Sequence, residues 1–330
     1  MDRKLVTVVR VDKLHKLPQF DNLLLAEIKG WKCLVKKDEF KEGDLGIYFE
    51  IDSVLPDVPK FEFMRKHNFR VKTIKMKGIY SQGLLLPLDI FDHSIEQALL
   101  NIGDDLTDYF GVTKYEVPDT FSHCDAKGSF PQFIQMTNAE RIQNHPEYFE
   151  LIKGKTVYVT EKLDGTSFTA YYRQGEFGVC SRNMEKKLTS EVDTYVNYFY
   201  NNNINLLLLD ISKKLDNHDV AIQGELIGTG IQKNHYNLKH KELFIFNVFD
   251  ITEQRYIIYN ILDVPVLDVM NFHMDSESFE TYCDILFNCK SRINSGVSIE
   301  GLVFTCYDDS FPFGRLIFKA LNPEYLLFLN

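Results

Sequence analysis

The N-terminal third of the chain consists of short apolar stretches separated by turn-forming residues, a pattern typical of β-strands. The pair Lys29-Gly30 lies between two such stretches and predicts a tight hairpin. A set of short strands with small helical inserts over about 100 residues predicts a small β-barrel of OB-like fold. Its strands are expected at residues 6–11, 23–28, 31–35, 44–49, 70–75 and 83–86.

A stretch without periodicity follows and predicts a linker. Residues 112–132 contain Pro118 and Pro131 and lack any regular spacing of apolar positions. We therefore expect an OB-like nucleic-acid-binding domain over residues 1–125 and a second domain over residues 133–330.

The second domain mixes strands with a few helices. The stretch 189–215 is compatible with a helix and is interrupted by asparagines at 201–203. This order of elements predicts an α+β domain built on largely antiparallel sheets, in which helices accompany the strands. Strands are expected at residues 156–161, 168–173, 177–181, 219–227, 243–249, 299–306 and 315–319.

Composition narrows the class of protein. The 330 residues are 45% hydrophobic and 25% charged, with a formal charge of −10, which excludes disordered, collagen-like and coiled-coil chains. The run of four leucines at 206–209 is too short for a membrane span, and the N-terminus lacks the apolar core of a secretory signal. The cysteines form no CxxC pair. We expect a cytoplasmic or nuclear protein that is not secreted.

One segment is strongly basic although the chain as a whole is acidic. Residues 60–77 hold seven Lys and Arg residues against the single acid Glu62, a local charge of +6, with aromatic residues interleaved. A basic stretch with aromatics on a β-surface suits contacts to a nucleic-acid backbone, although a solvated face has the same composition. The predicted RNA contacts in this segment are Lys72, Lys75 and Lys77.

The most informative segment is VTEKLDGTSFTAYYR at 159–173, where a predicted strand delivers Lys162 into a Leu-Asp-Gly turn. Taken alone, this turn equally suits an ordinary hairpin. Five further fragments follow it in order along the chain. They are SRNME at 181–185, GELIGTG at 224–230, LFIFNVFDI at 243–251, SIEGLVF at 298–304 and FKALN at 318–322.

In this order the fragments resemble motifs I, Ia, III, IIIa, IV and V of the covalent nucleotidyltransferases, which include DNA ligases, RNA ligases and mRNA capping enzymes. The stretch GELIGTGIQKNHYNL and the segment FIQMTNAERIQN at 133–144 are similar to ATP-dependent RNA ligases that seal nicks. An OB-like domain ahead of the motifs resembles the Deinococcus/Naegleria type of that family. The resemblance implies an adenylyltransferase domain of ATP-grasp-like antiparallel sheets with helices.

The chemistry implied by this resemblance requires a lysine that attacks ATP as the neutral amine. Lys162, at a predicted strand end beside Asp164, is the residue expected to carry AMP. A dry pocket and a nearby divalent metal are expected to favour the neutral amine. The carboxylates expected to hold Mg²⁺ or Mn²⁺, largely through its water molecules, are Asp164, Glu225 and Glu300.

The resemblance also implies contacts with the nucleotide and the RNA. Lys319 is expected to bind the α-phosphate and stabilise its developing charge, and Arg182 to orient a phosphate or the RNA end. The adenine is expected to stack on Phe246, with Phe244 an alternative at a similar position on the same strand. The residues expected to line the nucleotide pocket are Glu161, Arg141, Asp164, Glu225, Phe246 and Lys319.

The activity implied is that of an ATP-dependent RNA ligase. Such an enzyme joins 3′-OH and 5′-phosphate ends at nicks in RNA duplexes or RNA-containing duplexes, through lysyl-AMP and an adenylylated 5′ end. No obligate protein partner or membrane is expected. The alternatives are a DNA ligase or capping-type guanylyltransferase, and a non-catalytic RNA-binding adaptor.

Two features bear on these alternatives. DNA ligases and capping enzymes carry an OB domain after motif V, whereas only residues 320–330 follow Lys319, which favours an RNA ligase. All the key side chains are present, which disfavours the adaptor. Leu321 stands where many relatives have a second motif V lysine, and Ser167 where some have asparagine. These two positions leave the corresponding phosphate contacts open.

Overall fold

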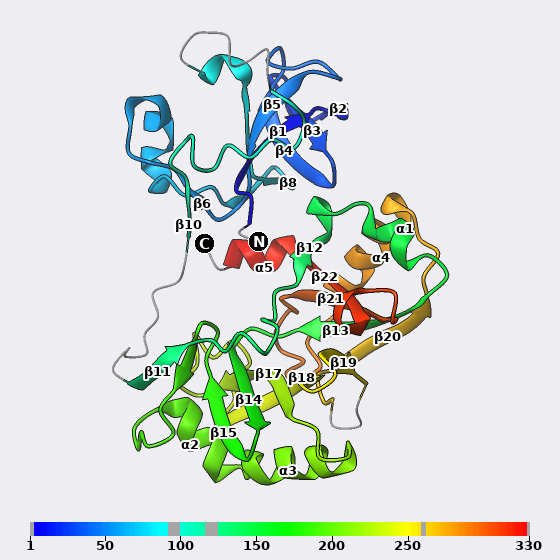
Figure 1. The fold of residues 1–330 in the computed structure, drawn as a ribbon. Helices are drawn as coiled ribbons and strands as arrows, with labels where there is room; N and C mark the ends of the chain where they lie inside the picture. Colours follow the sequence, from blue (N-terminus) through cyan, green and yellow to red (C-terminus); the bar gives the residue numbers. More distant parts are fainter. Residues whose placement is uncertain (1–2, 92–99, 116–124, 259–261, 329–330) are drawn as a thin grey trace. The chain divides into compact units, whose positions relative to one another are not determined.

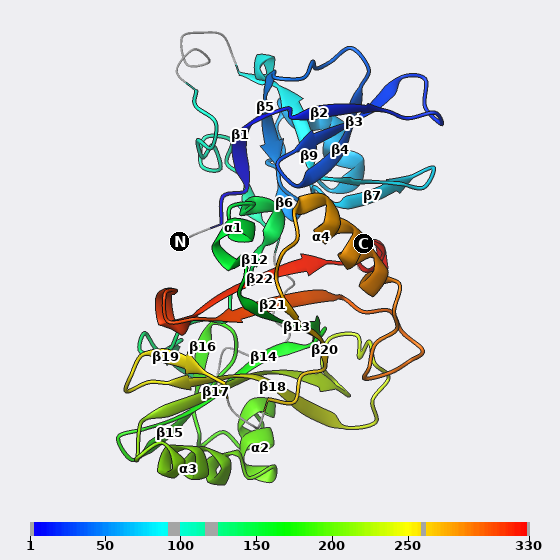
Figure 2. The same ribbon diagram turned by 90° about the vertical axis from the view of Figure 1, so that its right-hand side faces the viewer.

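The computed structural model describes residues 3–91, 100–115, 125–258 and 262–328. The chain divides into two units, Met1–Pro118 with Leu326–Asn330, and Asp119–Tyr325 (Figures 1 and 2). Residues 116–124 of the predicted linker lie outside the described residues, and a short strand flanks them on each side.

The first unit is built from short strands, as the sequence predicts. Its sheets are β1-β5-β9, β2-β3-β4, β7-β8 and β10-β6, all with antiparallel pairing. The elements are β1 (Val6–Arg10), β2 (Lys13–Lys16), β3 (Leu23–Ile28), β4 (Trp31–Lys36), β5 (Leu45–Phe49), β6 (Ser53–Val54), η1 (Pro59–His67), β7 (Thr73–Met76), β8 (Ile79–Gln82), β9 (Leu84–Pro87), η2 (Leu88–Ile90) and β10 (Thr113–Lys114).

The predicted strand at 70–75 starts late in the structure, at Thr73. The backbone of Val71 instead exchanges hydrogen bonds with Asp52 and Ser53, at 2.9 and 2.8 Å, so it is held by a different part of the unit. β7 continues into β8 through a tight turn at Lys77-Gly78, where both residues have positive φ. This is the backbone of a two-residue hairpin turn, which a Gly at the second position favours.

The second unit contains two larger sheets. The seven-stranded sheet has the order β11-β16-β15-β14-β17-β18-β19, and the five-stranded sheet has the order β12-β22-β21-β13-β20. Neighbours are antiparallel except β12 and β22, which confirms the expected α+β class. The elements are β11 (Ala126–Ser129), β12 (Glu140–Arg141), η5 (Ile142–Asn144), α1 (Tyr148–Ile152), β13 (Thr156–Lys162), β14 (Thr166–Arg173), β15 (Glu176–Cys180), β16 (Met184–Lys186), α2 (Thr194–Asn201), α3 (Ile204–Lys214), β17 (Val220–Gly228), β18 (Lys241–Asp250), β19 (Arg255–Ile257), β20 (Val266–Asn271), α4 (Ser276–Phe287), β21 (Gly301–Tyr307), η6 (Pro312–Gly314), β22 (Arg315–Leu321) and α5 (Pro323–Phe328).

Helices α2 and α3 cover one face of the seven-stranded sheet (Figure 1). The predicted break between them is confirmed, because Asn203 adopts a left-handed conformation with φ of 54°. Asp193 caps α2 by accepting hydrogen bonds from the backbone of Tyr195 and Val196. Phe199 and Leu208 then bury their side chains against the sheet.

Helices α1 and α4 pack in the same way on the five-stranded sheet, around Ile152, Phe279 and Phe304. Each sheet therefore has one face covered by helices and an opposite face that carries no helix. Arg315 of β22 donates a hydrogen bond to Asn247 of β18, so the helix-free faces of the two sheets meet. The buried Arg315 guanidinium also lies over the ring of Tyr256, 3.3 Å from its centroid.

A β-bulge interrupts the pairing of β17 with β18. Gln223 pairs with Asn247 and Gly224 with Ile245, so Phe246 is an extra residue in β18. Ile245 and Val248, three residues apart, both face the core under α2 and α3. The bulge thereby places Phe246 and Asn247 together on the opposite face.

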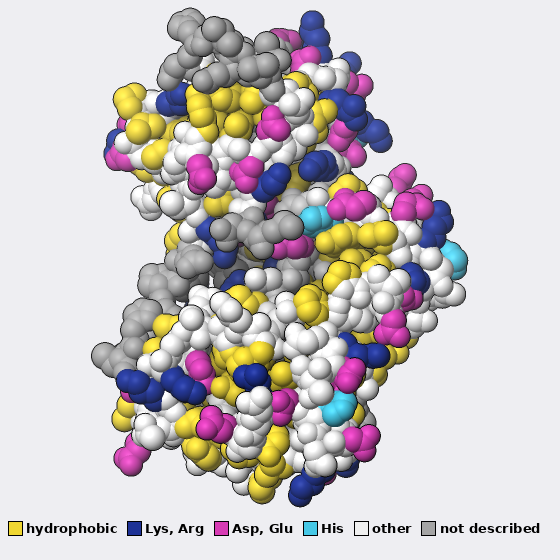
Figure 3. All heavy atoms as spheres, viewed as in Figure 1, with side chains coloured by type: hydrophobic (Ala, Val, Ile, Leu, Met, Phe, Trp, Pro, Cys, Tyr) yellow, Lys and Arg dark blue, Asp and Glu magenta, His cyan; other side chains and the backbone are white. Residues whose placement is uncertain are grey.

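None of the helices in the described ranges has the length and apolar composition needed to span a bilayer. On the face drawn in Figure 3, basic and acidic side chains are interspersed. The formal charge of −10 is thus not gathered into one acidic block on this face.

Candidate active site

The Lys162 turn is pressed against β17. β13 ends at Lys162 and β14 begins at Thr166, and Gly165 lies between them. A Cβ atom on Gly165 would come within 2.5 Å of the Leu226 carbonyl oxygen. Only glycine fits this close approach, which places the turn beside Glu225.

Strand pairing brings Glu300 to Lys162. Lys162 is the register partner of Gly301, the first residue of β21, and Glu300 directly precedes it. The Lys162 Nζ atom lies 2.7 Å from Glu300 Oε1, and the two side chains are 26% and 12% exposed. This is the contact between the expected nucleophile and one expected metal-binding carboxylate.

Three carboxylates surround the Lys162 ammonium and set its pKa. Burial lowers the pKa of Lys162, but the charges of Glu300, Glu225 and Asp164 outweigh burial and raise it above its ordinary value. Burial thus acts in the expected direction, toward the neutral amine, but in the chain without a bound metal the carboxylates outweigh it. The reason is that a carboxylate lies closer to the amine than the sequence could show.

The same cluster also shifts the pKa values of two of its acids, Glu225 and Glu300. Burial raises the pKa of Glu225 to about 7, with Lys162 opposing the shift and Glu300 and Asp164 adding to it. Burial also raises the pKa of Glu300, against the pull of Lys162. Burial and the mutual repulsion of the acids therefore outweigh the attraction of Lys162 for Glu225 and Glu300.

These residues fit a hydrated divalent cation. Glu300 Oε2 is buried and has no hydrogen-bond partner, so one carboxylate oxygen is available to a cation or its water. Across the described residues, no three Asp, Glu, His or Cys side chains converge closely enough to hold a metal ion directly. Mg²⁺ retains several waters when it binds proteins, which suits carboxylates that are spread around the site.

Two basic side chains come from adjacent strands. In the parallel pair of β12 with β22, Arg141 is the register partner of Lys319. The positive charge of Lys319 acts to lower the pKa of Glu300, against burial, and so favours the ionised carboxylate. The Arg141 residue is buried, with 6% of its surface exposed. Together they supply positive charge beside the carboxylates, which suits a polyphosphate.

Arg182 and Glu161 lie at the borders of the site. Arg182, just after β15, is exposed, donates a 3.4 Å hydrogen bond to Asn138 and favours the ionised form of Glu225. Glu161 is 1% exposed and accepts a 2.9 Å hydrogen bond from the backbone of Arg292. Burial raises the pKa of Glu161, against hydrogen bonds from Ser291 and Arg292. The Glu161 carboxylate thus also holds the loop that leads to Glu300.

Phe244 and Phe246 both lie on the face of β18 that is turned away from α2 and α3. They pack, half-buried, against Leu163 and Tyr236. Phe244 is the register partner of Glu225, whereas Phe246 sits at the bulge. The structure keeps both rings as candidates for stacking on a base.

The predicted basic stretch is partly neutralised by acids outside it. Arg65 pairs with Asp57 at 2.6 Å and Arg70 with Asp52 at 2.9 Å, so the local charge of +6 overstates what this surface presents. Lys75 and Lys77 are exposed on the β7–β8 hairpin and lie over aromatic rings, Lys75 over Tyr80 and Lys77 over Phe20. Lys72, half-buried, precedes the hairpin.

Three residues at the site were not predicted from the sequence: Tyr236, Asn322 and Tyr325. Asp164 donates its backbone N–H to the Tyr236 hydroxyl at 2.9 Å. Asn322 accepts a hydrogen bond from the backbone of Glu324 at the start of α5. The dipeptide Asn322-Pro323 is a helix-start signal that could have indicated this helix.

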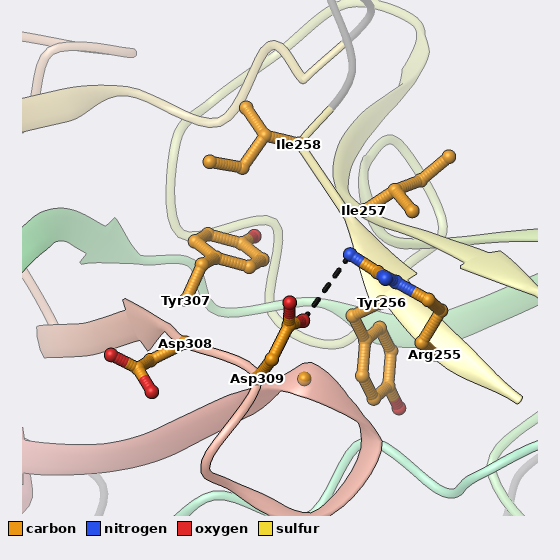
Figure 4. A pocket seen from close by; sticks show the side chains of 8 residues that line it. Arg255, Tyr256, Ile257, Ile258, Tyr307, Asp308 and Asp309 are labelled. Atoms are coloured by element: carbon orange, nitrogen blue, oxygen red, sulfur yellow. Dashed lines mark ion pairs between the residues drawn. The ribbon is translucent and has the colours of Figure 1, made fainter.

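A separate open pocket of about 410 Å³ lies at the far end of β21 (Figure 4). Tyr307, the last residue of β21, lines it, whereas Glu300 precedes the first. Its charged groups are paired, Arg255 with Asp309 at 3.4 Å and Asp308 with Lys155. The residues with catalytic chemistry are therefore at the opposite end of the strand.

Comparisons with known proteins agree with this arrangement. The RNA ligase family model matches residues 155–321, and an OB-fold domain model matches residues 5–88, which confirms the predicted OB-like fold. No curated protein matches the chain.

Solved structures of the Naegleria gruberi RNA ligase are similar over nearly the whole chain. The structure with PPi is 32% identical with a TM-score of 0.85, covering 99% of this chain and 98% of that one. A mutant with AMP and Mn is 31% identical with a TM-score of 0.84, covering 98% of both chains. A mutant with ATP and Mn is also 31% identical, with a TM-score of 0.85 and the same coverage.

Proposed function

The chain belongs to the RNA ligase family, and from that premise we propose that it is an ATP-dependent ligase that joins 3′-OH and 5′-phosphate RNA ends at nicks. Lys162 is the nucleophile of the proposed reaction. ATP is the AMP donor, and Mg²⁺ or Mn²⁺ is the metal, in keeping with the ATP, AMP and Mn in the Naegleria structures. The substrate is a nicked RNA duplex or an RNA-containing duplex.

The reaction proceeds in three steps. The Lys162 amine attacks the α-phosphorus of ATP, an N–P bond forms, and pyrophosphate leaves. The AMP then passes to the RNA 5′-phosphate, which gives a 5′–5′ pyrophosphate linkage and frees the amine. In the last step the 3′-OH attacks that 5′-phosphate and AMP leaves. Splitting the ligation in this way replaces one hard displacement with easier ones.

The residues of the chain bind the phosphates, orient them and hold the divalent cation. Lys319 and Arg141 bind the phosphates and stabilise the charge that develops on them, and Arg182 orients a phosphate of the nucleotide or the RNA. Asp164, Glu225 and Glu300 hold the divalent cation, largely through its waters. When bound, this cation offsets the carboxylate charge and screens the phosphates. The Lys162 amine then no longer faces three uncompensated carboxylates, which favours its neutral form.

The observation that carries the proposal is the 2.7 Å contact of Lys162 with Glu300, next to Glu225 and Asp164. A surface lysine with one acidic partner would gain little from such a contact. Here three acids converge on one half-buried lysine at the end of a strand. This setting suits a lysine that attacks a polyphosphate held by a divalent metal.

We also propose a division of labour between residues 1–125 and residues 133–330. The first domain contacts the nucleic acid, with Lys72, Lys75 and Lys77 on or beside an exposed hairpin. The second carries out AMP transfer, since all the proposed nucleotide-binding residues belong to it.

The deciding experiment is incubation with α-labelled ATP and Mn²⁺, followed by peptide mapping. We expect an acid-labile AMP adduct on Lys162. Lys162→Ala should abolish the adduct, while Lys214→Ala, at an exposed lysine of α3, should leave it unchanged. A stable AMP adduct on the Lys162→Ala protein would show that the nucleophile is assigned wrongly.

A further inference from the structure

The Asp164 turn is held by a tyrosine of the stretch GELIGTGIQKNHYNL, to which the sequence assigned no role. Tyr236 is 1% exposed, and its hydroxyl accepts the 2.9 Å hydrogen bond from the Asp164 backbone. The carbonyl oxygen of Tyr236 in turn accepts a 2.9 Å hydrogen bond from the Asn294 side chain. The tyrosine is therefore fixed at its backbone and at the tip of its side chain.

A second tyrosine lies near the same aspartate. Tyr325 in α5 is 3% exposed, and burial together with the charges of the nearby Asp164 and Glu300 carboxylates raises the pKa of its hydroxyl. Asn322 fixes the start of α5 against the strand that carries Glu300. Its backbone N–H donates to the Glu300 carbonyl at 2.9 Å, and its side chain donates to the Ile299 carbonyl at 3.1 Å.

A histidine joins the two tyrosines. The His235 ring lies edge-on to both, with centroid distances of 5.0 Å to Tyr236 and 5.0 Å to Tyr325. Its Nε2 atom donates to the Ser298 carbonyl at 2.9 Å, two residues before Glu300. We call Tyr236, His235 and Tyr325 the aromatic bracket. It ties the Asp164 turn to the segment that presents Glu300.

Repulsion between two carboxylates explains why such a bracket is needed. Asp164 and Glu300 repel each other at a partly buried site where water screens them poorly. Strand pairing places Glu300 beside Lys162, whereas Asp164 lies in the turn after β13 and outside the pairing. Other contacts must therefore set the distance of the Asp164 carboxylate from Glu300.

We propose that the aromatic bracket is a positioning unit that sets the separation of the Asp164 and Glu300 carboxylates on either side of Lys162. The inference rests on the proposed function and deepens it. Tyr236 fixes the turn that carries Asp164, and Tyr325, packed against His235, places its hydroxyl near the Asp164 and Glu300 carboxylates. Neither tyrosine touches the reacting atoms.

The test compares Tyr325→Phe and Tyr236→Phe with a matched control, Tyr282→Phe. Tyr282 donates a hydrogen bond to Asp268 at 2.9 Å, between α4 and β20. Two quantities are measured on the full chain. One is the single-turnover rate of lysyl-AMP formation as a function of Mn²⁺ and of ATP, and the other is the rise in melting temperature caused by Mn²⁺ without ATP.

We expect Tyr325→Phe to raise the Mn²⁺ concentration for half-maximal rate about five- to tenfold, because the polar hydroxyl near the Asp164 and Glu300 carboxylates is removed. The melting-temperature rise caused by Mn²⁺ should shrink in parallel. Tyr236→Phe should lower the maximal rate by a similar factor with little change in the KM for ATP. Tyr282→Phe should match the wild type in Mn²⁺ dependence and in rate.

The proposal is overturned if both bracket variants lower the melting temperature but keep the wild-type Mn²⁺ dependence and maximal rate. The bracket would then serve only the stability of the fold. If Tyr325→Phe does not fold, Tyr236→Phe decides by its maximal rate. A wild-type chain that takes up no AMP would contradict the proposed function instead, so the two failures are distinguishable.

Discussion

The Lys162 ammonium lies 2.7 Å from the Glu300 carboxylate because β13 and β21 pair with Lys162 opposite Gly301. The contact thus depends on the register of a strand pair rather than on a flexible loop. A slip of one residue in that register would turn Lys162 to the other face of the sheet. The position of the nucleophile and the packing of the five-stranded sheet are therefore set together.

Replacing Asp164 by Asn, or Glu225 or Glu300 by Gln, should lower the rate of lysyl-AMP formation on the order of 10²–10³-fold each. The amides keep the shape of the side chains but remove the charge that holds the cation. Because the acids are crowded and partly buried, the melting temperatures should not fall. Label transfer at limiting Mn²⁺ measures the effect, and near wild-type rates in all three variants would contradict the metal site.

Gly165→Ala should impair both folding and activity, since its Cβ would lie 2.5 Å from the Leu226 carbonyl oxygen and 2.6 Å from the Ile227 side chain. The turn must move off β17, and Lys162 moves with it. Gly128→Ala is the matched control, because a Cβ there meets nothing within 4 Å. Thermal melts and adduct formation should separate the two variants clearly, and equal behaviour would show that the close approach is not needed.

We expect a ribose to be required on the 3′-OH side of the nick. The 2′-OH there can be recognised by hydrogen bonds and through the A-form shape of the duplex. The measurement compares sealing of nicks that differ only in the sugar at the 3′ end. Equal sealing of all-DNA and all-RNA nicks would indicate a DNA ligase activity.

Changing Lys72, Lys75 and Lys77 together to Gln should weaken RNA binding and flatten its dependence on salt. Each lost phosphate contact lowers the slope of log K against log salt by about 0.9 for a duplex of B-DNA type. Adduct formation from ATP should not change. The control triple variant, at exposed lysines of the same unit, is Lys36, Lys37 and Lys41 to Gln. Unchanged slopes would leave the hairpin lysines as a solvated surface.

The His218–Asp250 pair should make stability depend on pH. The 2.7 Å hydrogen bond that His218 donates to Asp250 raises the pKa of His218 above its ordinary 6.5, so the folded chain holds the proton more tightly than the unfolded chain. This contribution is complete below pH 6.5 and is lost as the pH rises through the raised pKa. His218→Gln should therefore lower the melting temperature at pH 6 more than at pH 8.5. His240→Gln, at a ring 72% exposed, is the control, and parallel losses at both pH values would contradict the assignment.

The sequence indicated the parts of the site that lie close together in the chain. Lys162, Asp164 and Gly165 share one turn, and turn chemistry is legible from local residue types. The break in the helical stretch at 201–203 was equally local, because asparagine tolerates the left-handed conformation found at Asn203.

Contacts between distant residues could not be predicted. Tyr236 is 72 positions from Asp164, and an aromatic residue with that separation carries no local signal of a hydrogen bond. The neutralising acids Asp52 and Asp57 likewise lie outside the basic stretch that they pair with. The effect of Glu300 on the pKa of Lys162 could not be predicted for the same reason, since Glu300 lies 138 positions further along.

The bulge in β18 makes Phe246 an extra residue in the pairing of β17 with β18. If the codon for Phe246 were deleted, Ile245 and Asn247 would become neighbours opposite Gly224 and Gln223, which they already face. Ile245 and Val248 would still point into the core beneath α2 and α3 by simple alternation. Phe244, opposite Glu225, has no such freedom. A single-codon deletion at 246 is therefore a route by which evolution can remove a ring from the surface beside Leu163 and Tyr236 while the same residues of β18 still face the core under α2 and α3.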